Sequence, residues 1–339
     1  MNLSLKRDEL LVPDSGRGVR LDRWVAEHCP NLSRARVQEL IEEGLVTVND
    51  ARSKASYKLR GGDRVFVEAR ERPPLSAEPE SIPLQILYED GDLLVVNKPA
   101  GMSVHAGAGN SRGTLVNALL GRGQELSQGG IDQLRPGIVH RLDKETSGSI
   151  AIAKNDFAHA RLALAFSSRA VKKTYIALAE GKFEESAGRI NFPIGRDPVR
   201  RTRMRALVAD PRPGRKSLAG MAREALTEWK KLLELGPATL LEIQLHTGRT
   251  HQIRVHLSAV RHPLVGDTLY GAASHLRAGK TGMPALGRQF LHAAKLGFPH
   301  PRTGTWIEAS APLATDLRDY LERLADLEGQ SLDAARNYL

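Results

Sequence analysis

The residues from Gly137 to Gly148 read GIVHRLDKETSG. It places one carboxylate, Asp143, among basic side chains in a turn that the sequence predicts between two apolar strands, Gly137–His140 and Ser149–Ala153. Basic neighbours favour the ionised form of such a carboxylate. On spacing alone, a surface turn held by ion pairs remains an alternative to a catalytic turn.

The segments around this turn predict an α+β fold with a mixed sheet. Period-two patterns predict strands at Leu84–Tyr88, Leu93–Asn97, Thr174–Leu178, Thr227–Leu233, Leu240–Leu245 and Thr305–Ala309. Helical spacing predicts helices at Thr114–Leu120, Asp156–Phe166, Thr250–Val260 and Leu313–Leu327. Strands and helices do not alternate strictly, which argues against a doubly wound sheet. The strands 227–233 and 240–245 are expected to pair antiparallel.

The N-terminal part of the chain reads as a separate small domain, residues 1–70. It has a predicted helix at Leu21–His28 and a second helix ending at Glu43, with Ser33 as its N-cap. Short strands are predicted at Leu45–Asn49 and Val65–Val67. Residues 71–83 are rich in proline and read as a linker. A catalytic domain is then expected at residues 84–339.

Composition restricts the class of protein. The 339 residues are 41% hydrophobic and 26% charged, as in ordinary globular domains, and no apolar run approaches the ~18 residues that span a bilayer. Charges from Lys6 to Glu9 argue against a signal peptide. A single cysteine, Cys29, leaves no internal disulfide and no cysteine cluster for zinc. These features predict a cytoplasmic protein that acts away from membranes.

The net charge of +10 favours a polyanionic partner, and its distribution sharpens that expectation. Between Arg189 and Lys216 there are nine basic residues and two acidic ones. This stretch includes Arg200, Arg201 and Arg203, whose guanidinium groups suit phosphates. An RNA partner is therefore predicted, with a solvated loop as the alternative.

Two further clusters carry candidate chemistry. Leu245–His256 contains three histidines five residues apart, a spacing that does not place them on one helical face as a metal site requires. Thr250 is expected to cap a helix that carries His251 and Arg254 on one face. In Val171–Ala177, Tyr175 lies in a predicted strand beside lysines, where a half-buried structural tyrosine is the default interpretation.

Common nucleotide-hydrolase, dinucleotide-binding and serine-hydrolase motifs do not occur. The clusters, in this order, closely resemble the Rlu-type family of pseudouridine synthases that act on large-subunit ribosomal RNA. The first 70 residues resemble the small alpha-L RNA-binding motif often found before that catalytic domain. The matching strings are Asn97–Gly101, His105–Gly109, His140–Gly148, Lys173–Tyr175, Gly248–His256 and His262–Asp267.

The resemblance implies a pseudouridine synthase domain with a mixed, mainly antiparallel sheet, and it implies roles for individual residues. Asp143 matches the family's catalytic aspartate, and Arg254 matches the arginine that pairs with it. Tyr175 is expected to stack on the flipped uracil, and Arg141 to fill the space that the base leaves. The isomerisation changes neither the number of bonds nor the charge, so no metal, cofactor or energy source is expected. Attack on the sugar, attack on the base and a glycal route all stay open.

In the N-terminal domain, acidic residues nearly balance the basic ones, so RNA binding there requires arginines gathered on one helical face. The expected binding residues are Arg20, Arg23, Arg34 and Arg36. Ribosomal RNA is the expected substrate and transfer RNA the alternative. A non-catalytic assembly factor would not need Asp143, Tyr175 and Arg254 together, and a nuclease would usually need a metal site or a histidine pair.

Overall fold

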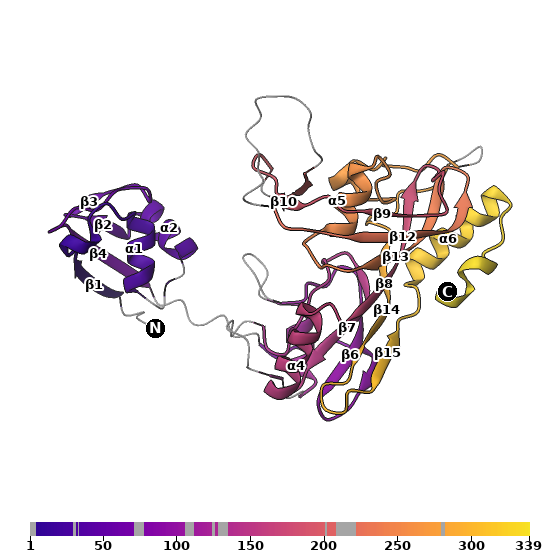
Figure 1. Ribbon diagram of the computed structural model, residues 1–339, viewed down its shortest axis with the longest axis horizontal. Helices are drawn as coiled ribbons and strands as arrows, with labels where there is room; N and C mark the ends of the chain where they lie inside the picture. Colours follow the sequence, from indigo (N-terminus) through magenta and orange to yellow (C-terminus); the bar gives the residue numbers. More distant parts are fainter. Residues whose placement is uncertain are drawn as a thin grey trace. The chain divides into compact units, whose positions relative to one another are not determined.

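The computed structural model describes residues 5–29, 32, 34–70, 78–105, 112–123, 126–127, 135–200, 202–207, 222–278 and 282–339. The chain divides into two compact units, Met1–Ser76 and Ala77–Leu339 (Figure 1). Several predictions fall outside the described residues: the N-cap Ser33, Arg201, most of the 71–83 linker and most of His105–Gly109. The side chain of Arg36 is also outside them.

The N-terminal unit packs two helices on a small antiparallel sheet. The helices are α1 (Leu21–His28) and α2 (Arg34–Glu43), and the strands in sheet order are β1 (Leu5–Leu11), β4 (Arg64–Arg70), β2 (Val46–Val48) and β3 (Ala51–Arg52). Leu21, Trp24 and Val25 have the i, i+3, i+4 spacing of one helical face, and they are buried in one cluster with Val37 and Leu40. Apolar periodicity therefore explains both helices.

The sequence interpretation missed the first strand, β1. Its sequence, LKRDELL, is largely charged. β1 pairs only with β4 among the described residues and forms one edge of the sheet. Charged side chains are common on edge strands because one side of the strand meets solvent. The apolar pattern by which strands are recognised is therefore weak in this segment.

The second unit is built on a mixed sheet with the strand order β5-β6-β7-β14-β8-β13-β12-β9, and β15 also pairs with β14. Among the described residues, β7 and β14 form the only parallel pair of this sheet, so the predicted mainly antiparallel α+β fold is confirmed. The bounds are β5 Gln85–Glu89, β6 Leu93–Lys98, β7 Ser147–Ala153, β8 Lys172–Glu180, β9 Ala187–Ile190, β12 Thr227–Leu235, β13 Ala238–Leu245, β14 Leu291–Pro299 and β15 Trp306–Ser310.

Helices cover both faces of this sheet, and alternation along the strands shows which helix covers which face. In β8, Tyr175 and Ala177 belong to a cluster with Leu119 of α3 (Leu115–Gly121) and Leu257 of α5 (Gln252–Ala259). The intervening Ile176 and Leu178 face α6 (Thr315–Glu328). Similarly, α4 (Asp156–Ser167) packs on Val95 and Ala151. Helices α3 and α5 thus share the face that holds Tyr175.

One strand prediction next to the candidate turn was wrong, and one strand was missed. Gly137–His140 is not a strand: Gly137 has φ 72°, and only Ile138 forms an isolated bridge, to Ile152. Conversely, β14 was not predicted, although it lies between β7 and β8 and is mostly buried. Its sequence, LHAAKLGFP, contains a lysine, a glycine and a proline. These residues weaken the strand pattern in the sequence. The position of β14 is determined instead by the strands that pair with it.

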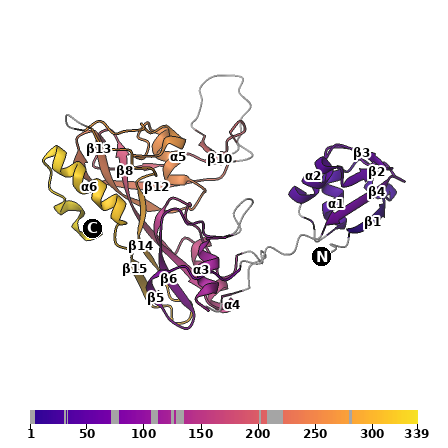
Figure 2. The ribbon, with the colours of Figure 1, turned by 180° about the vertical axis from the view of Figure 1, so that it is seen from behind.

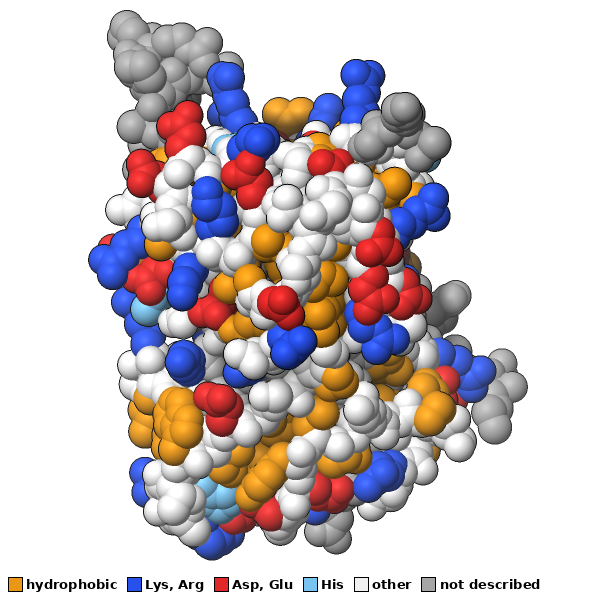
Figure 3. Space-filling view, turned by 90° about the vertical axis from the view of Figure 1, so that its right-hand side faces the viewer, with side chains coloured by type: hydrophobic (Ala, Val, Ile, Leu, Met, Phe, Trp, Pro, Cys, Tyr) orange, Lys and Arg blue, Asp and Glu red, His pale blue; other side chains and the backbone are white. Residues whose placement is uncertain are grey.

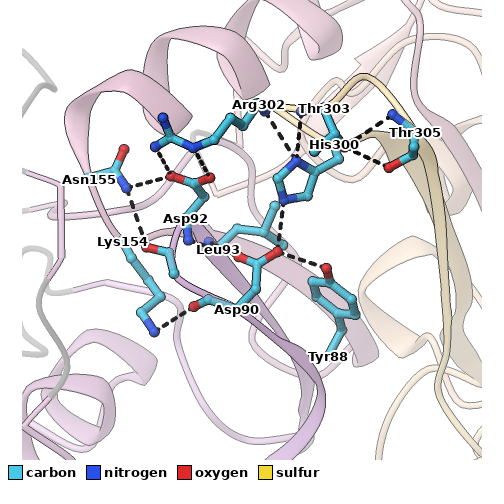
Figure 4. A network of polar contacts seen from close by, with 11 residues as sticks. Tyr88, Asp90, Asp92, Leu93, Lys154, Asn155, His300, Arg302, Thr303 and Thr305 are labelled. Carbon is cyan, nitrogen blue, oxygen red and sulfur yellow. Dashed lines mark hydrogen bonds and ion pairs between the residues drawn. The ribbon is translucent and has the colours of Figure 1, made fainter.

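A polar network joins the turn after β5 to the turn between β14 and β15 (Figure 4). Asp90 accepts hydrogen bonds from the hydroxyl of Tyr88 (2.7 Å) and from Nε2 of His300 (2.8 Å). Asp92 receives two hydrogen bonds from Arg302, at 2.7 and 2.5 Å. The Arg302 hydrogen bonds lower the pKa of Asp92 to about 2. The network fixes one end of β6 and of β14, the strands on either side of β7.

Candidate active site

Asp143 lies in the turn that leads into β7. Its side chain is 17% exposed, and its carbonyl accepts a hydrogen bond from the amide of Thr146 (3.1 Å). Immediately after the turn, Gly148 has φ 117° and passes so close to β14 that a Cβ atom there would lie 2.3 Å from the carbonyl oxygen of Ala293. A side chain would therefore separate the parallel strands, which explains why glycine follows the turn.

A buried lysine ties the turn to β6. The Nζ of Lys98 donates to the carbonyls of Pro99 (2.7 Å), Met102 (2.9 Å) and Lys144 (3.1 Å). Burial lowers the pKa of Lys98 to about 7, against the raising effect of Glu145 and Asp143. Lys98 thus holds the backbone beside Asp143, close enough for its charge to interact with that carboxylate.

Arg254, on α5, lies against both Asp143 and a second carboxylate. Its Nη1 is 3.5 Å from Oδ2 of Asp143, whereas its Nε and Nη2 donate to Asp267 at 2.7 and 2.8 Å. Asp267 has a side chain that is only 1% exposed. The structure therefore brings together the predicted pair of Arg254 and Asp143, but the tight bidentate partner is Asp267, to which the sequence interpretation gave no role. It lies in the string His262–Asp267, which was a signal that could have found it.

The start of α5 differs from the prediction. The helix begins at Gln252, and its N-cap is His251 in the left-handed region (φ 55°), so Thr250 is not the cap. Gln252 instead satisfies the polar groups before the helix, because its side-chain oxygen accepts from the hydroxyl of Thr247 and from the amide of Arg249. The unusual backbone turns the imidazole of His251 toward Asp143, with Nε2 4.0 Å from Oδ1.

Tyr175 completes the arrangement from β8. It is 8% exposed and lines a small cavity of about 50 Å³ together with Arg141, Leu142, Asp143, Ile253, Arg254 and Leu291. Burial raises the pKa of Tyr175, and Asp143 raises it further, so the phenol stays neutral near pH 7. Arg141 is exposed, and it lies two residues before Asp143 on the same turn. One cavity is thus lined by all four residues predicted for catalysis and base flipping, Asp143, Tyr175, Arg254 and Arg141.

Comparison with known proteins identifies the class of enzyme. Residues 92–259 match the family model of RNA pseudouridylate synthase, and residues 19–65 match the S4 domain. An RNA pseudouridine synthase of Chloroflexus aurantiacus is 47% identical over 94% of this chain and 93% of its own length. The chain belongs to the RNA pseudouridine synthase family.

Further relatives support the same family assignment. The ribosomal large subunit pseudouridine synthase D of Nitrosomonas europaea is 41% identical over 96% of this chain and 90% of that protein. The solved structure of human RNA pseudouridylate synthase domain containing 1 has a TM-score of 0.52 at 28% identity, covering 73% of this chain and 97% of that one. The synthase is therefore an isomerase that acts on RNA.

Two of the four predicted RNA-binding arginines of the S4 domain, Arg20 and Arg34, bond to one buried carboxylate. Asp22 is fully buried, and it accepts hydrogen bonds from Arg20 (2.9 Å), Arg34 (2.9 Å) and Gln38 (2.7 Å). Burial alone would raise the pKa of Asp22, but these hydrogen bonds outweigh it and hold the pKa well below its usual range. Arg20 and Arg34 remain 38% and 54% exposed. Arg23 forms a surface pair with Glu27 instead.

The predicted basic stretch of the synthase contains a hairpin of β10 (Ile194–Arg196) and β11 (Met204–Ala206), which lies next to α5 (Figures 1 and 2). Arg200, in the connection between the strands, is exposed. The guanidinium of Arg203 lies over the ring of Tyr270, 5.1 Å from its centroid. The hairpin therefore contacts residues beside the cavity.

Three further features of the described residues, namely surface charge, membrane-spanning helices and metal ligands, add little to the family assignment. On the face seen in Figure 3, basic and acidic side chains are interspersed among hydrophobic ones, so no broad field of one sign covers it. In the part of the chain that the structure describes, no helix is long and apolar enough to cross a membrane. Within that same part, no three His, Cys, Asp or Glu side chains lie close enough together to hold a metal ion.

Proposed function

We propose that this synthase isomerises specific uridines of large-subunit ribosomal RNA, with Asp143 as the catalytic carboxylate. The observation that carries the proposal is the position of Asp143 in the cavity. It is the only carboxylate among the described cavity-lining residues, and Arg254 contacts it without saturating it. A nucleophile or base has to lie within about 3 Å of its target, and Arg254 places a positive charge 3.5 Å from the carboxylate that would act.

The chemistry needs one carboxylate and a held base. Pseudouridylation breaks the bond from ribose to uracil N1, turns the uracil, and joins ribose to C5, with no net change in bonds or charge. Asp143 serves as nucleophile toward sugar or base, or as the base that removes a ribose proton on a glycal route. In each case the uracil has to stay in the cavity while it is detached.

Tyr175 is proposed to hold the detached uracil by stacking. Its ring lies in the cavity wall, and base–aromatic stacking contributes roughly 1–3 kcal/mol per base. Because burial raises the pKa of Tyr175, its hydroxyl is a poor general base at neutral pH, which favours the stacking role over proton abstraction at C5. Exposed Arg141, beside Asp143, is proposed to occupy the space in the RNA that the flipped uridine leaves.

The substrate proposal rests on relatives and on the S4 domain. Relatives from Nitrosomonas europaea and Xanthomonas campestris, 41% and 39% identical, are named ribosomal large subunit pseudouridine synthase D. Each alignment covers at least 96% of this chain, including its S4 domain. The arginines around Asp22 and the basic hairpin supply contacts to phosphates. This substrate implies that the enzyme works in the cytoplasm.

The test is a map of pseudouridine in total RNA from cells that contain or lack this protein. We expect specific large-subunit sites to lose the modification, and the wild-type protein to restore it. Asp143→Asn, which keeps the size and removes the charge, should restore nothing while binding RNA normally. Loss confined to transfer RNA would overturn the substrate, and restoration by Asp143→Asn would overturn the catalytic role.

A further inference from the structure

His251 and Arg254 lie near different oxygens of the candidate catalytic carboxylate. Its Nε2 lies 4.0 Å from Oδ1 of Asp143, while Nη1 of Arg254 lies 3.5 Å from Oδ2. Both separations exceed the length of a hydrogen bond, so the carboxylate lies between two donors without being fixed by either. A small movement of the Asp143 side chain toward His251 would form a hydrogen bond on that side.

Tyr270, in the short helix η3 (Thr268–Tyr270), lies within hydrogen-bond distance of His251 and can select its tautomer. The phenol oxygen of Tyr270 accepts from the amide of Met204 (2.9 Å) and lies 2.8 Å from Nδ1 of His251. If the phenol donates its own proton to Nδ1, that proton has an acceptor, and the imidazole proton is on Nε2, the nitrogen nearest to Asp143. The opposite tautomer would leave the phenol proton unused and direct a lone pair at Asp143.

The surroundings of Tyr270 keep it in this position. Tyr270 is 5% exposed, and its carbonyl accepts a hydrogen bond from Ser258 of α5 (2.7 Å). Its ring lies 5.0 Å from the guanidinium carbon of Arg254 and 5.1 Å from that of Arg203. Burial lowers the pKa of His251, against the raising effect of Asp143, so the imidazole is neutral near pH 7. A neutral Nε2–H donor can orient a carboxylate without protonating it.

We propose that His251 is a positioning residue that orients Asp143 through its Nε2–H, and that Tyr270 holds His251 in the required tautomer. This inference rests on the proposed catalytic role of Asp143. It also connects the basic hairpin to the reaction, because the amide of Met204 is bonded to the same phenol that orients His251. RNA held by Arg203 would therefore bind next to the residue whose amide contacts this phenol.

Two substitutions at His251 distinguish the effect of losing the Nε2–H donor from the effect of the left-handed backbone. The amide nitrogen of glutamine reaches close to the position of Nε2, whereas that of asparagine reaches only the position of Nδ1. Asparagine, however, tolerates the left-handed backbone at φ 55° better than glutamine does. If the donor matters, His251→Gln should keep a kcat within about tenfold of the wild type. His251→Asn should lose about 10- to 100-fold, the size expected for one hydrogen bond to a charged group.

The fold and the RNA affinity provide the controls. His251→Asn is expected to be at least as thermally stable as His251→Gln, so the order of activity should oppose the order of stability. The KM for RNA should stay close to that of the wild type in both variants, because the donor acts on Asp143 and not on RNA. A kcat for His251→Asn equal to or above that of His251→Gln would overturn the inference.

Tyr270→Phe tests the second step. It keeps the ring beside both arginines and removes only the hydroxyl, so it should lower kcat by about tenfold. In a His251→Asn background the same change should have almost no further effect, because both substitutions interrupt one chain. Additive losses would show that Tyr270 acts independently of His251. If Asp143→Asn itself stays active, the proposed function fails; if it is inactive while His251→Asn keeps the full rate, only this inference fails.

Discussion

The S4 domain and the catalytic cavity both combine arginine with buried aspartate, but in opposite ways. In the S4 domain, Asp22 is fully buried, and the arginines that bond to it, Arg20 and Arg34, extend to solvent. In the cavity, Arg254 is buried and tightly bonded to Asp267, and Asp143 is the partner left incompletely paired. The buried group that orients the others is therefore the carboxylate of Asp22 in the S4 domain and the guanidinium of Arg254 in the cavity.

This difference indicates which charge each region offers to RNA. A buried charge needs a partner of opposite sign, and that partner also orients any further group around it. Asp22 therefore orients guanidinium groups that can meet phosphates. Arg254, whose charge is largely compensated by Asp267, orients a carboxylate that can meet the sugar or the base. In both regions, the group predicted to act on RNA is the one that its ion pair leaves accessible.

The largest effect is expected from breaking the anchor in the cavity. Arg254→Met leaves Asp267 buried without a partner, which should destabilise the unit by ~3–5 kcal/mol and lower kcat by about 100-fold or more. The double variant Arg254→Met with Asp267→Leu removes both charges, so it should regain most of the stability but not the activity. Thermal unfolding and single-turnover kinetics measure the two quantities. Recovery of activity in the double variant would contradict the role of Arg254 at Asp143.

The sequence predicted some helices and strands of the two units better than others. Helix α1 was predicted with its observed bounds, and β12 and β13 were predicted to within two residues, because apolar periodicity determines them locally. Strand β14 was missed because its place depends on β7 and β8, which lie more than 100 residues earlier in the chain. Local patterns therefore predict elements, but they do not predict the order of strands in the sheet.

The cavity shows the same limit at the level of single residues. Asp143, Tyr175 and Arg254 came from the family resemblance, whereas Asp267 and Tyr270 received no role. Both lie in or beside the short helix η3, where no periodicity reveals that they face Arg254. His251 was expected inside the first turn of α5, but its positive φ places it before the helix. Roles that depend on contacts between distant loops could not be read from spacing.

A smaller effect is expected at Tyr175, which tests whether the cavity holds the base by its apolar wall and not by charge alone. Tyr175→Ala should weaken binding of a target oligonucleotide by ~1–3 kcal/mol, whereas Tyr175→Phe keeps the ring and should bind nearly as the wild type does. Because burial raises the pKa of Tyr175, the pH profile of Tyr175→Phe should match that of the wild type below pH 9. Equal binding by the two variants would exclude stacking as its role.

The pH dependence of stability tests whether the charge of Asp22 anchors the S4 domain. The pKa of folded Asp22 lies below its unfolded value, so its contribution to stability is full above about pH 4 and is lost as the pH falls through the folded value. Asp22→Asn should therefore destabilise the helices α1 and α2 by ~1–2 kcal/mol at pH 7 and by less near pH 2, allowing for the exposure of its arginine partners. Hydrogen exchange of the helix amides at both pH values measures this. A destabilisation that does not change with pH would show that the charge of Asp22 is not the anchor.

The smallest effect concerns the arginines that Asp22 orients. Replacing Arg20 and Arg34 by glutamine should weaken RNA binding by several-fold and reduce the slope of log affinity against log salt by about 0.7–0.9 for each phosphate that is no longer neutralised. The matched control is Arg318→Gln with Arg336→Gln, two exposed arginines in surface ion pairs on and after α6, the helix on the sheet face opposite to Tyr175. Both double variants remove two positive charges, so a general field effect would lower their slopes equally. A larger change for the Arg20 and Arg34 variant, with kcat at saturating RNA unaltered, would assign these arginines to direct phosphate binding. Equal slopes would instead mean that burying Asp22 serves the stability of the S4 domain alone.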